Sequence, residues 1–175
     1  MNKENLKKEL TSKKVEFERT IEVLEMIKNI DLSKYNGKKI SKRIATYVEK
    51  NLRELNSNFR FYAMIIDEFK PKSLLIVAHE KGNYDNKCEI EINLCSFEDA
   101  YNGKSDFDVD FYNQDLERYI KLNRDYVSNA NHDLENIDLI VTEHKKIIDS
   151  VENFNRNILK SNFIEPKCEY LKGIF

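Results

Sequence analysis

The sequence predicts an α+β fold, in which long N- and C-terminal helices pack as an antiparallel coiled coil and a three- to four-stranded antiparallel sheet lies between them. Residues 2–30 and 113–161 contain no Gly or Pro, and their apolar residues recur at helical spacing. Residues 59–95 instead consist of short β-branched and aromatic runs separated by turn residues. The length of 175 residues fits a single domain (1–175), with 2–30 and 113–161 as a coiled-coil arm and 38–111 as a module of one helix and the sheet.

The N-terminal half begins with two predicted helices. The apolar stripe of residues 2–30 is formed by Leu6, Leu10, Phe17, Ile21, Leu24 and Ile27. A turn at Asn36-Gly37 ends this region, because this dipeptide favours turn conformations. The second helix is expected from about Lys38 to Leu55, with an apolar stripe of Ile40, Ile44, Tyr47, Val48, Leu52 and Leu55.

Three strands are predicted next, and short turns join them into an antiparallel meander. The first strand starts at Phe59, the second is the buried run that starts at Ser73, and the third alternates from Lys87 to Cys95. Residues 106–111, with the sequence DFDVDF, also alternate. They predict either a fourth, edge strand or an acidic loop.

The C-terminal region carries the longest pattern of the chain, a heptad seam whose spacings alternate between four and three residues. Its members are Leu116, Ile120, Asn123, Val127, Ala130, Leu134, Ile137, Val141, His144, Ile148, Val151, Asn155 and Ile158. One helix over 113–161 or two helices broken near residues 128–131 would fit this pattern. The N-terminal helix is the expected antiparallel partner, and a second copy of the chain, giving a homodimer through the seam, is the alternative.

Charge and composition exclude several classes of protein. The formal net charge is −2, whereas domains that coat nucleic acid are usually strongly basic. No run of 18 apolar residues and no apolar N-terminal segment occur, so we expect neither a membrane span nor a secretory signal. Three unevenly spaced cysteines argue against a disulfide framework and favour a reducing cytoplasm.

An acidic row is the first candidate for a partner-binding site. Asp106, Asp108 and Asp110 alternate, and Asp115 and Glu117 follow at the start of the predicted helix. On a strand, alternate carboxylates are about 6.6 Å apart and would imitate a row of phosphates in a basic groove. One competing interpretation is a solvated acidic edge, which protects a sheet from aggregation. The other is a calcium loop that starts at Asp106, but the sixth position of an EF-hand loop should be Gly and is Phe111 here.

A basic segment is the second candidate, and it would contact phosphates. Residues 38–60 carry a net charge of +5. The residues that would contact phosphates are Lys38, Lys39, Lys42, Arg43 and Arg53. A solvated helix face is the competing interpretation.

The sequence offers no catalytic or cofactor motif. Walker A, G-x-S-x-G and G-x-G-x-x-G patterns are absent, and the three histidines lie far apart without metal-ligand spacing. We therefore expect a chain without enzymatic activity, cofactor or metal ion.

The segment DLSKYNGKKISKRIATYVEK, residues 31–50, resembles small uncharacterised accessory proteins of Firmicute phages, plasmids and conjugative elements. The matching residues are Asn36, Gly37, Lys38, Lys42 and Arg43. Accessory proteins of this kind include inhibitors of host defence, among them anti-CRISPR proteins. The resemblance implies a non-catalytic phage or mobile-element inhibitor that evades host defence by binding a host protein such as a CRISPR effector nuclease. The alternative is a small nucleic-acid-binding or structural coiled-coil protein of the same element.

Overall fold

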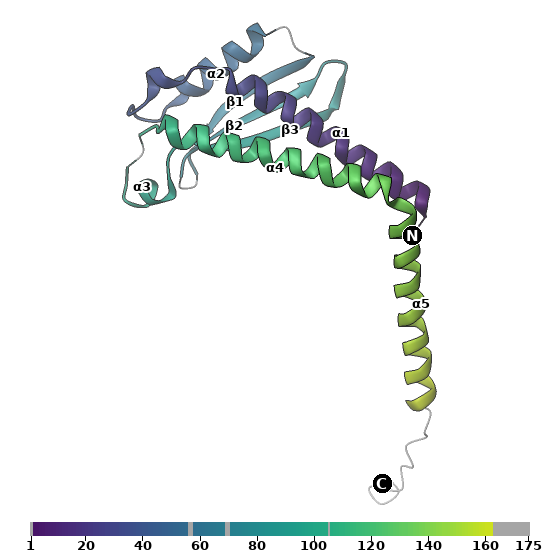
Figure 1. The fold of residues 1–175 in the computed structure, drawn as a ribbon. Helices are drawn as coiled ribbons and strands as arrows, with labels where there is room; N and C mark the ends of the chain where they lie inside the picture. The colour runs from purple at the N-terminus through teal and green to yellow at the C-terminus, as the bar shows by residue number, and fades with distance from the viewer. Residues whose placement is uncertain (1, 56–57, 69–70, 105, 163–175) are drawn as a thin grey trace, which may run out of the picture. The chain divides into compact units, whose positions relative to one another are not determined.

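The computed structural model describes residues 2–55, 58–68, 71–104 and 106–162, and along the chain its helices precede and follow a three-stranded sheet (Figure 1). The fold is α+β, as predicted, with long helices before and after the strands. In chain order the elements are α1 (Lys3–Lys28), the 3₁₀ helix η1 (Ser33–Tyr35), α2 (Lys42–Glu54), β1 (Phe59–Ile66), β2 (Ser73–Glu80), β3 (Asn83–Asn93), α3 (Phe97–Tyr101), α4 (Val109–Glu135) and α5 (Ile137–Asn162).

The sheet is an antiparallel meander in the order β1-β2-β3, which confirms the three predicted strands. Phe61 pairs with Ala78, and Ile76 pairs with Ile90. Because side chains alternate along a strand, this register places Phe61, Ile76 and Ile90 on one face of the sheet, where all are buried. Among the described residues, 106–111 do not form a fourth strand, since Asp106 makes only an isolated bridge with Lys39 and Val109 already begins α4.

Helix α2 covers the outer edge of β1 with two charged side chains. The Glu49 carboxylate accepts a hydrogen bond from the Ala63 N–H (2.9 Å), and the Arg53 Nε donates to the Phe61 carbonyl (3.2 Å). Glu49 and Arg53 also form an ion pair at 2.6 Å. These side chains occupy two of the outward-facing backbone groups of β1, which hinders pairing with another strand at this point of the edge.

Helices α1 and α4 run antiparallel to each other along the buried face of the sheet (Figure 1). Phe17 stacks on Tyr126 with ring centroids 4.8 Å apart, Glu25 pairs with Arg124 at 2.7 Å, and Lys28 pairs with Glu117 at 2.5 Å. The core beneath them includes Val23, Leu24, Ile27, Ile44, Val48, Leu52, Leu116 and Ile120.

The chain divides into two compact units. One contains the described residues of 1–10 and 132–175, and the other contains those of 11–131. The C-terminal seam is split into α4 and α5 at Asn136, later than the 128–131 stretch that the sequence marks as weakest. At this point the Asn136 side chain donates to the His132 carbonyl (2.8 Å).

The Tyr112 hydroxyl is the structural oddity of the core. The side chain is 1% exposed, and its oxygen has no hydrogen-bond partner among the described residues. Burial raises the pKa of Tyr112 above its ordinary value, because the phenolate would be poorly solvated. We therefore expect this hydroxyl to lower the stability of the fold.

We expect Tyr112→Phe to raise the free energy of unfolding by about 1 kcal/mol, because it removes a buried polar group without a partner and keeps the ring. Urea denaturation followed by circular dichroism measures this change. A loss of stability would contradict the interpretation and show that the hydroxyl is satisfied in solution.

Candidate acidic–aromatic docking surface

Four carboxylates gather around a surface depression of about 400 Å³ in the unit of residues 11–131. They come from α3, from the segment before α4 and from the first turn of α4. The lining residues are Asn36, Gly37, Asp99, Lys104, Asp106, Phe107, Asp108 and Asp110. With one lysine among them, the lining carries an excess of negative charge.

Backbone hydrogen bonds between two loops build this depression. The Gly37 N–H donates to the Phe107 carbonyl and the Phe107 N–H donates to the Lys38 carbonyl, both at 2.8 Å. The Asn36 side chain accepts from the Val109 N–H at 3.1 Å. Gly37 has a φ of +68°, a conformation that glycine adopts without strain. The Asn36-Gly37 turn can therefore present both residues to the segment of residues 107–109.

The three alternating aspartates have different environments. The Asp108 Oδ1 accepts hydrogen bonds from the N–H groups of Asp110 and Phe111, both at 3.0 Å, so this carboxylate caps the N-terminus of α4. Asp106 and Asp110 are exposed. The residues thus share one depression, but they lack the regular strand spacing that the phosphate-mimicry hypothesis assumed.

Asp115 and Glu117 face other parts of the fold. Asp115 is 5% exposed, and its carboxylate accepts from the Asn93 N–H (3.1 Å) and from Arg118 (2.5 Å). Glu117 pairs with Lys28 on α1. The structure therefore does not bring these two carboxylates to the depression.

Helix α3 adds two exposed aromatic side chains beside the carboxylates. Phe97 is 65% exposed and Tyr101 is 89% exposed, and with Glu98 and Asn102 they line a second hollow of about 500 Å³. Single exposed apolar side chains are common, but neighbouring ones such as these are typical of interaction surfaces. We call Phe97, Glu98, Asp99, Tyr101, Asp106 and Asp110 the acidic–aromatic surface.

Local hydrogen bonds hold α3 in place. Ser96 caps the helix by accepting from the Asp99 N–H (3.1 Å), and its hydroxyl donates to the Asp99 carboxylate (3.0 Å). The bond from Ser96 and the nearby Lys104 ammonium, 3.2 Å away, lower the pKa of Asp99. Sequence reasoning missed α3 as a candidate site, although the S-x-x-D spacing of Ser96 and Asp99 is a helix-start signal.

The candidate phosphate-contacting residues divide into two groups. Lys38, Lys39, Lys42 and Arg43 are all exposed near the start of α2. Arg53 instead bonds Glu49 and the edge of β1. The basic segment also adjoins the acidic depression, since Lys39 forms the isolated bridge with Asp106.

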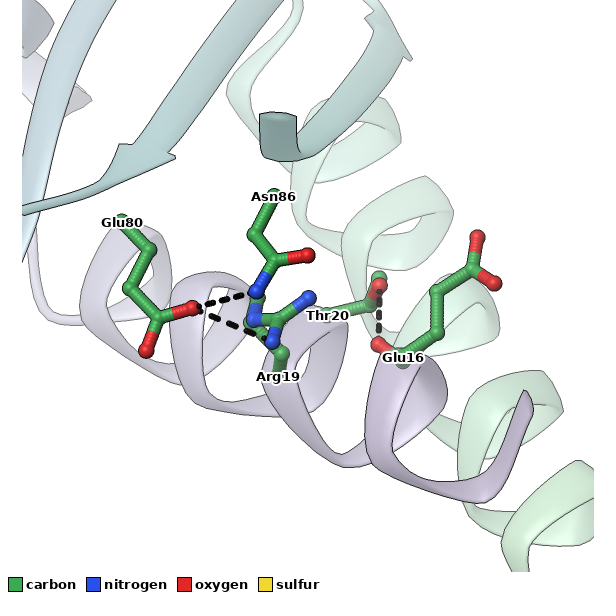
Figure 2. Close-up of polar contacts among 5 residues, drawn as sticks. All are labelled: Glu16, Arg19, Thr20, Glu80 and Asn86. Atoms are coloured by element: carbon green, nitrogen blue, oxygen red, sulfur yellow. Dashed lines mark hydrogen bonds and ion pairs between the residues drawn. The ribbon is translucent and has the colours of Figure 1, made fainter. Parts of the chain in front are cut away.

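A polar cluster joins α1 to the β2–β3 hairpin (Figure 2). The Glu80 carboxylate accepts from Arg19 (3.2 Å) and from Asn86 (2.9 Å), while Thr20 donates to the Glu16 carbonyl within α1. Nearby, the buried Cys88 thiol contacts the Thr20 hydroxyl at 3.4 Å, and burial raises the pKa of this thiol. A protonated thiol is a poor nucleophile, which argues against a reactive role for Cys88. The contacts of Arg19 and Thr20 instead join α1 to the sheet.

Within the described residues, no group of three or more His, Cys, Asp or Glu side chains is arranged to hold a metal ion. None of the described helices combines the length and the apolar character that crossing a membrane requires. Comparisons with protein-family models, with curated proteins and with solved structures found no match for this chain.

Proposed function

We propose that the chain is a non-catalytic binding protein that docks its acidic–aromatic surface on a basic surface of a partner protein. The nucleic-acid-binding groove of a host defence nuclease, such as a CRISPR effector, is the class of partner that the resemblance of residues 31–50 implies. Docking there would inhibit the nuclease by excluding its nucleic acid.

The observation that carries this proposal is the exposure of Phe97 and Tyr101 next to carboxylates. Aromatic side chains dominate the energetic centres of protein interfaces, because they bury a large area at a small entropic cost. The surrounding carboxylates would steer the chain toward positive charge and accelerate association. Ser96 caps α3 and Asp108 caps α4, so local hydrogen bonds hold both helix starts and little ordering of them would be needed on binding.

The carboxylates predict a binding reaction that depends on salt. In the variant Asp106→Asn, Asp108→Asn and Asp110→Asn, we expect slower association with the partner, because three negative charges are removed. Asn is as good a helix cap as Asp, so the start of α4 should be kept. The measurement is a pull-down from the native host, identification of the partner, and association rates at low and high salt.

A matched control variant removes three exposed carboxylates elsewhere in the same unit: Glu22→Gln, Asp85→Asn and Asp125→Asn. Its net charge equals that of the first variant, so a loss specific to the first variant locates the interface. Equal association of both variants with the partner at low salt would contradict the proposal.

The alternative is a nucleic-acid-binding protein, favoured by the exposed cations Lys38, Lys39, Lys42 and Arg43. Lys42 and Arg43 lie in the first turn of α2, where the helix dipole disfavours positive charge. A gel shift with DNA and RNA at two salt concentrations separates the two functions. Binding that is strong at low salt and lost in Lys42→Glu/Arg43→Glu would favour this alternative.

A further inference from the structure

Helix α5 carries an apolar stripe that is covered at one end and exposed over the rest of its described length. Ile137, at the start of the helix, is buried, and Ile140 and Val141 are half-buried. An ion pair between Lys3 and Asp138 ties this end to the start of α1. Farther along, Ile147, Val151 and Phe154 are 60%, 52% and 63% exposed.

This exposed stripe needs a partner for a physical reason. An isolated helix is marginally stable in water, and most helical stability in proteins comes from packing of an apolar face. The stripe continues the heptad pattern of the sequence, with Val141, Ile148 and Asn155 at position a, and His144 and Val151 at position d. Ile140, Ile147 and Phe154 occupy position g, and Lys145 and Glu152 occupy position e.

We propose that the exposed stripe of α5 binds the same stripe of a second copy of this chain, with the two helices antiparallel. The register places Ile148 of one copy against Val151 of the other. His144 then faces Asn155, so that the polar seam residues meet each other instead of apolar side chains. Such polar pairs fix register in coiled coils.

The flanking positions support the antiparallel orientation through charge complementarity. In an antiparallel pair, positions e face each other and positions g face each other. Lys145 of each copy then lies beside Glu152 of the other, and Ile147 lies beside Phe154. A parallel pair would instead place position g against position e, so that Ile147 would lie against Glu152 and Ile140 against Lys145.

Sedimentation equilibrium of the full chain tests the association. We expect a reversible monomer–dimer equilibrium, and we expect Val151→Asp to abolish the dimer because it places a charge in the seam. Circular dichroism of the variant checks that the helices remain. A chain that is monomeric at all concentrations, or a Val151→Asp variant that dimerises like the wild type, would overturn the proposal.

A charge exchange tests the orientation. Lys145→Glu turns two attractive pairs into two repulsive ones, so the dissociation constant should rise about tenfold. Adding Glu152→Lys to the same chain should bring the dissociation constant back to within about threefold of the wild-type value, because the pairs are re-formed with reversed sign. The control is Lys146→Glu, a matched charge reversal at the opposite face of the helix, which should leave dimerisation unchanged.

One outcome of the charge exchange contradicts the antiparallel orientation, and one outcome of a deletion contradicts the proposed occupant. If Lys145→Glu and the double variant dimerise equally weakly, positions 145 and 152 do not face each other. Glu152 also pairs with Arg156 of its own helix at 3.2 Å, so Glu152→Lys alone is measured as the control for the loss of that pair. If deletion of residues 163–175 converts a monomeric chain into a dimer, the stripe is covered by the chain's own C-terminal segment in the full protein, and the proposed occupant is wrong.

Discussion

Replacing Phe107 with alanine should lower the free energy of unfolding by about 3 to 4 kcal/mol, the usual cost of deleting a buried phenyl ring. Phe107 is 1% exposed and packs against Tyr112, with ring centroids 5.7 Å apart. Its backbone also joins the Gly37–Lys38 loop through two hydrogen bonds. The same residue therefore supports the core and holds the floor of the acidic depression. Urea denaturation of the full chain measures the loss.

Phe97→Ala is the matched control, because it deletes the same side chain from an exposed position. We expect its free energy of unfolding to stay within about 0.5 kcal/mol of the wild type. Its binding to the partner should nevertheless weaken, since Phe97 is an aromatic anchor of the proposed surface. A large loss of stability in Phe97→Ala, or an unchanged stability in Phe107→Ala, would contradict the roles assigned to these two rings.

The secondary structure was predictable where the pattern is long and local. The first two strands begin at Phe59 and Ser73 in the structure, as the sequence predicts. Both starts were predictable because an Asn-Ser segment and a Pro-Lys segment immediately precede the apolar residues of the strands. The stripe of residues 2–30 predicts α1 (Lys3–Lys28) to within two residues at each end. Its antiparallel neighbour is α4, which starts at Val109 and thus earlier than the predicted residue 113.

The acidic segment shows why short patterns mislead. The segment DFDVDF alternates between acidic and apolar residues, as a strand does. In the structure its second half instead forms the start of α4, with Asp108 as the helix cap and Asp110 in the first turn. Six residues do not distinguish a period of 2.0 from the start of a period of 3.6. The outcome depends on the contacts of Phe107 with the Gly37–Lys38 loop, about seventy residues away in the chain.

The candidate site was predictable as a charge excess but not as a surface. Residues 98–110 carry a net charge of −4, and three of the five acidic residues singled out in the sequence meet at the depression. The exposure of Phe97 and Tyr101 follows from the orientation of a five-residue helix, which no periodicity specifies. Likewise, the burial of Asp115 depends on the position of Asn93 at the end of β3.

Asp115→Ala should destabilise the fold by about 2 to 3 kcal/mol, because it leaves a backbone N–H without its acceptor at the junction of α4 and β3. The carboxylate accepts from the Asn93 N–H and, at 3.4 Å, from the Asn93 side-chain amide. On its other side it holds Arg118, whose side chain is largely exposed. The measurement is the midpoint of urea denaturation with an unchanged slope.

Two further variants separate the contributions to this junction. Asp115→Asn keeps an acceptor for the Asn93 N–H, so its free energy of unfolding should fall by only about 1 kcal/mol. Arg118→Ala removes only a partly exposed ion pair, so its free energy of unfolding should fall by less than that. Because Asp115 is buried, partner binding by the folded Asp115→Asn protein should equal that of the wild type. A variant at position 115 that keeps its stability but loses the partner would show instead that this carboxylate belongs to the docking surface.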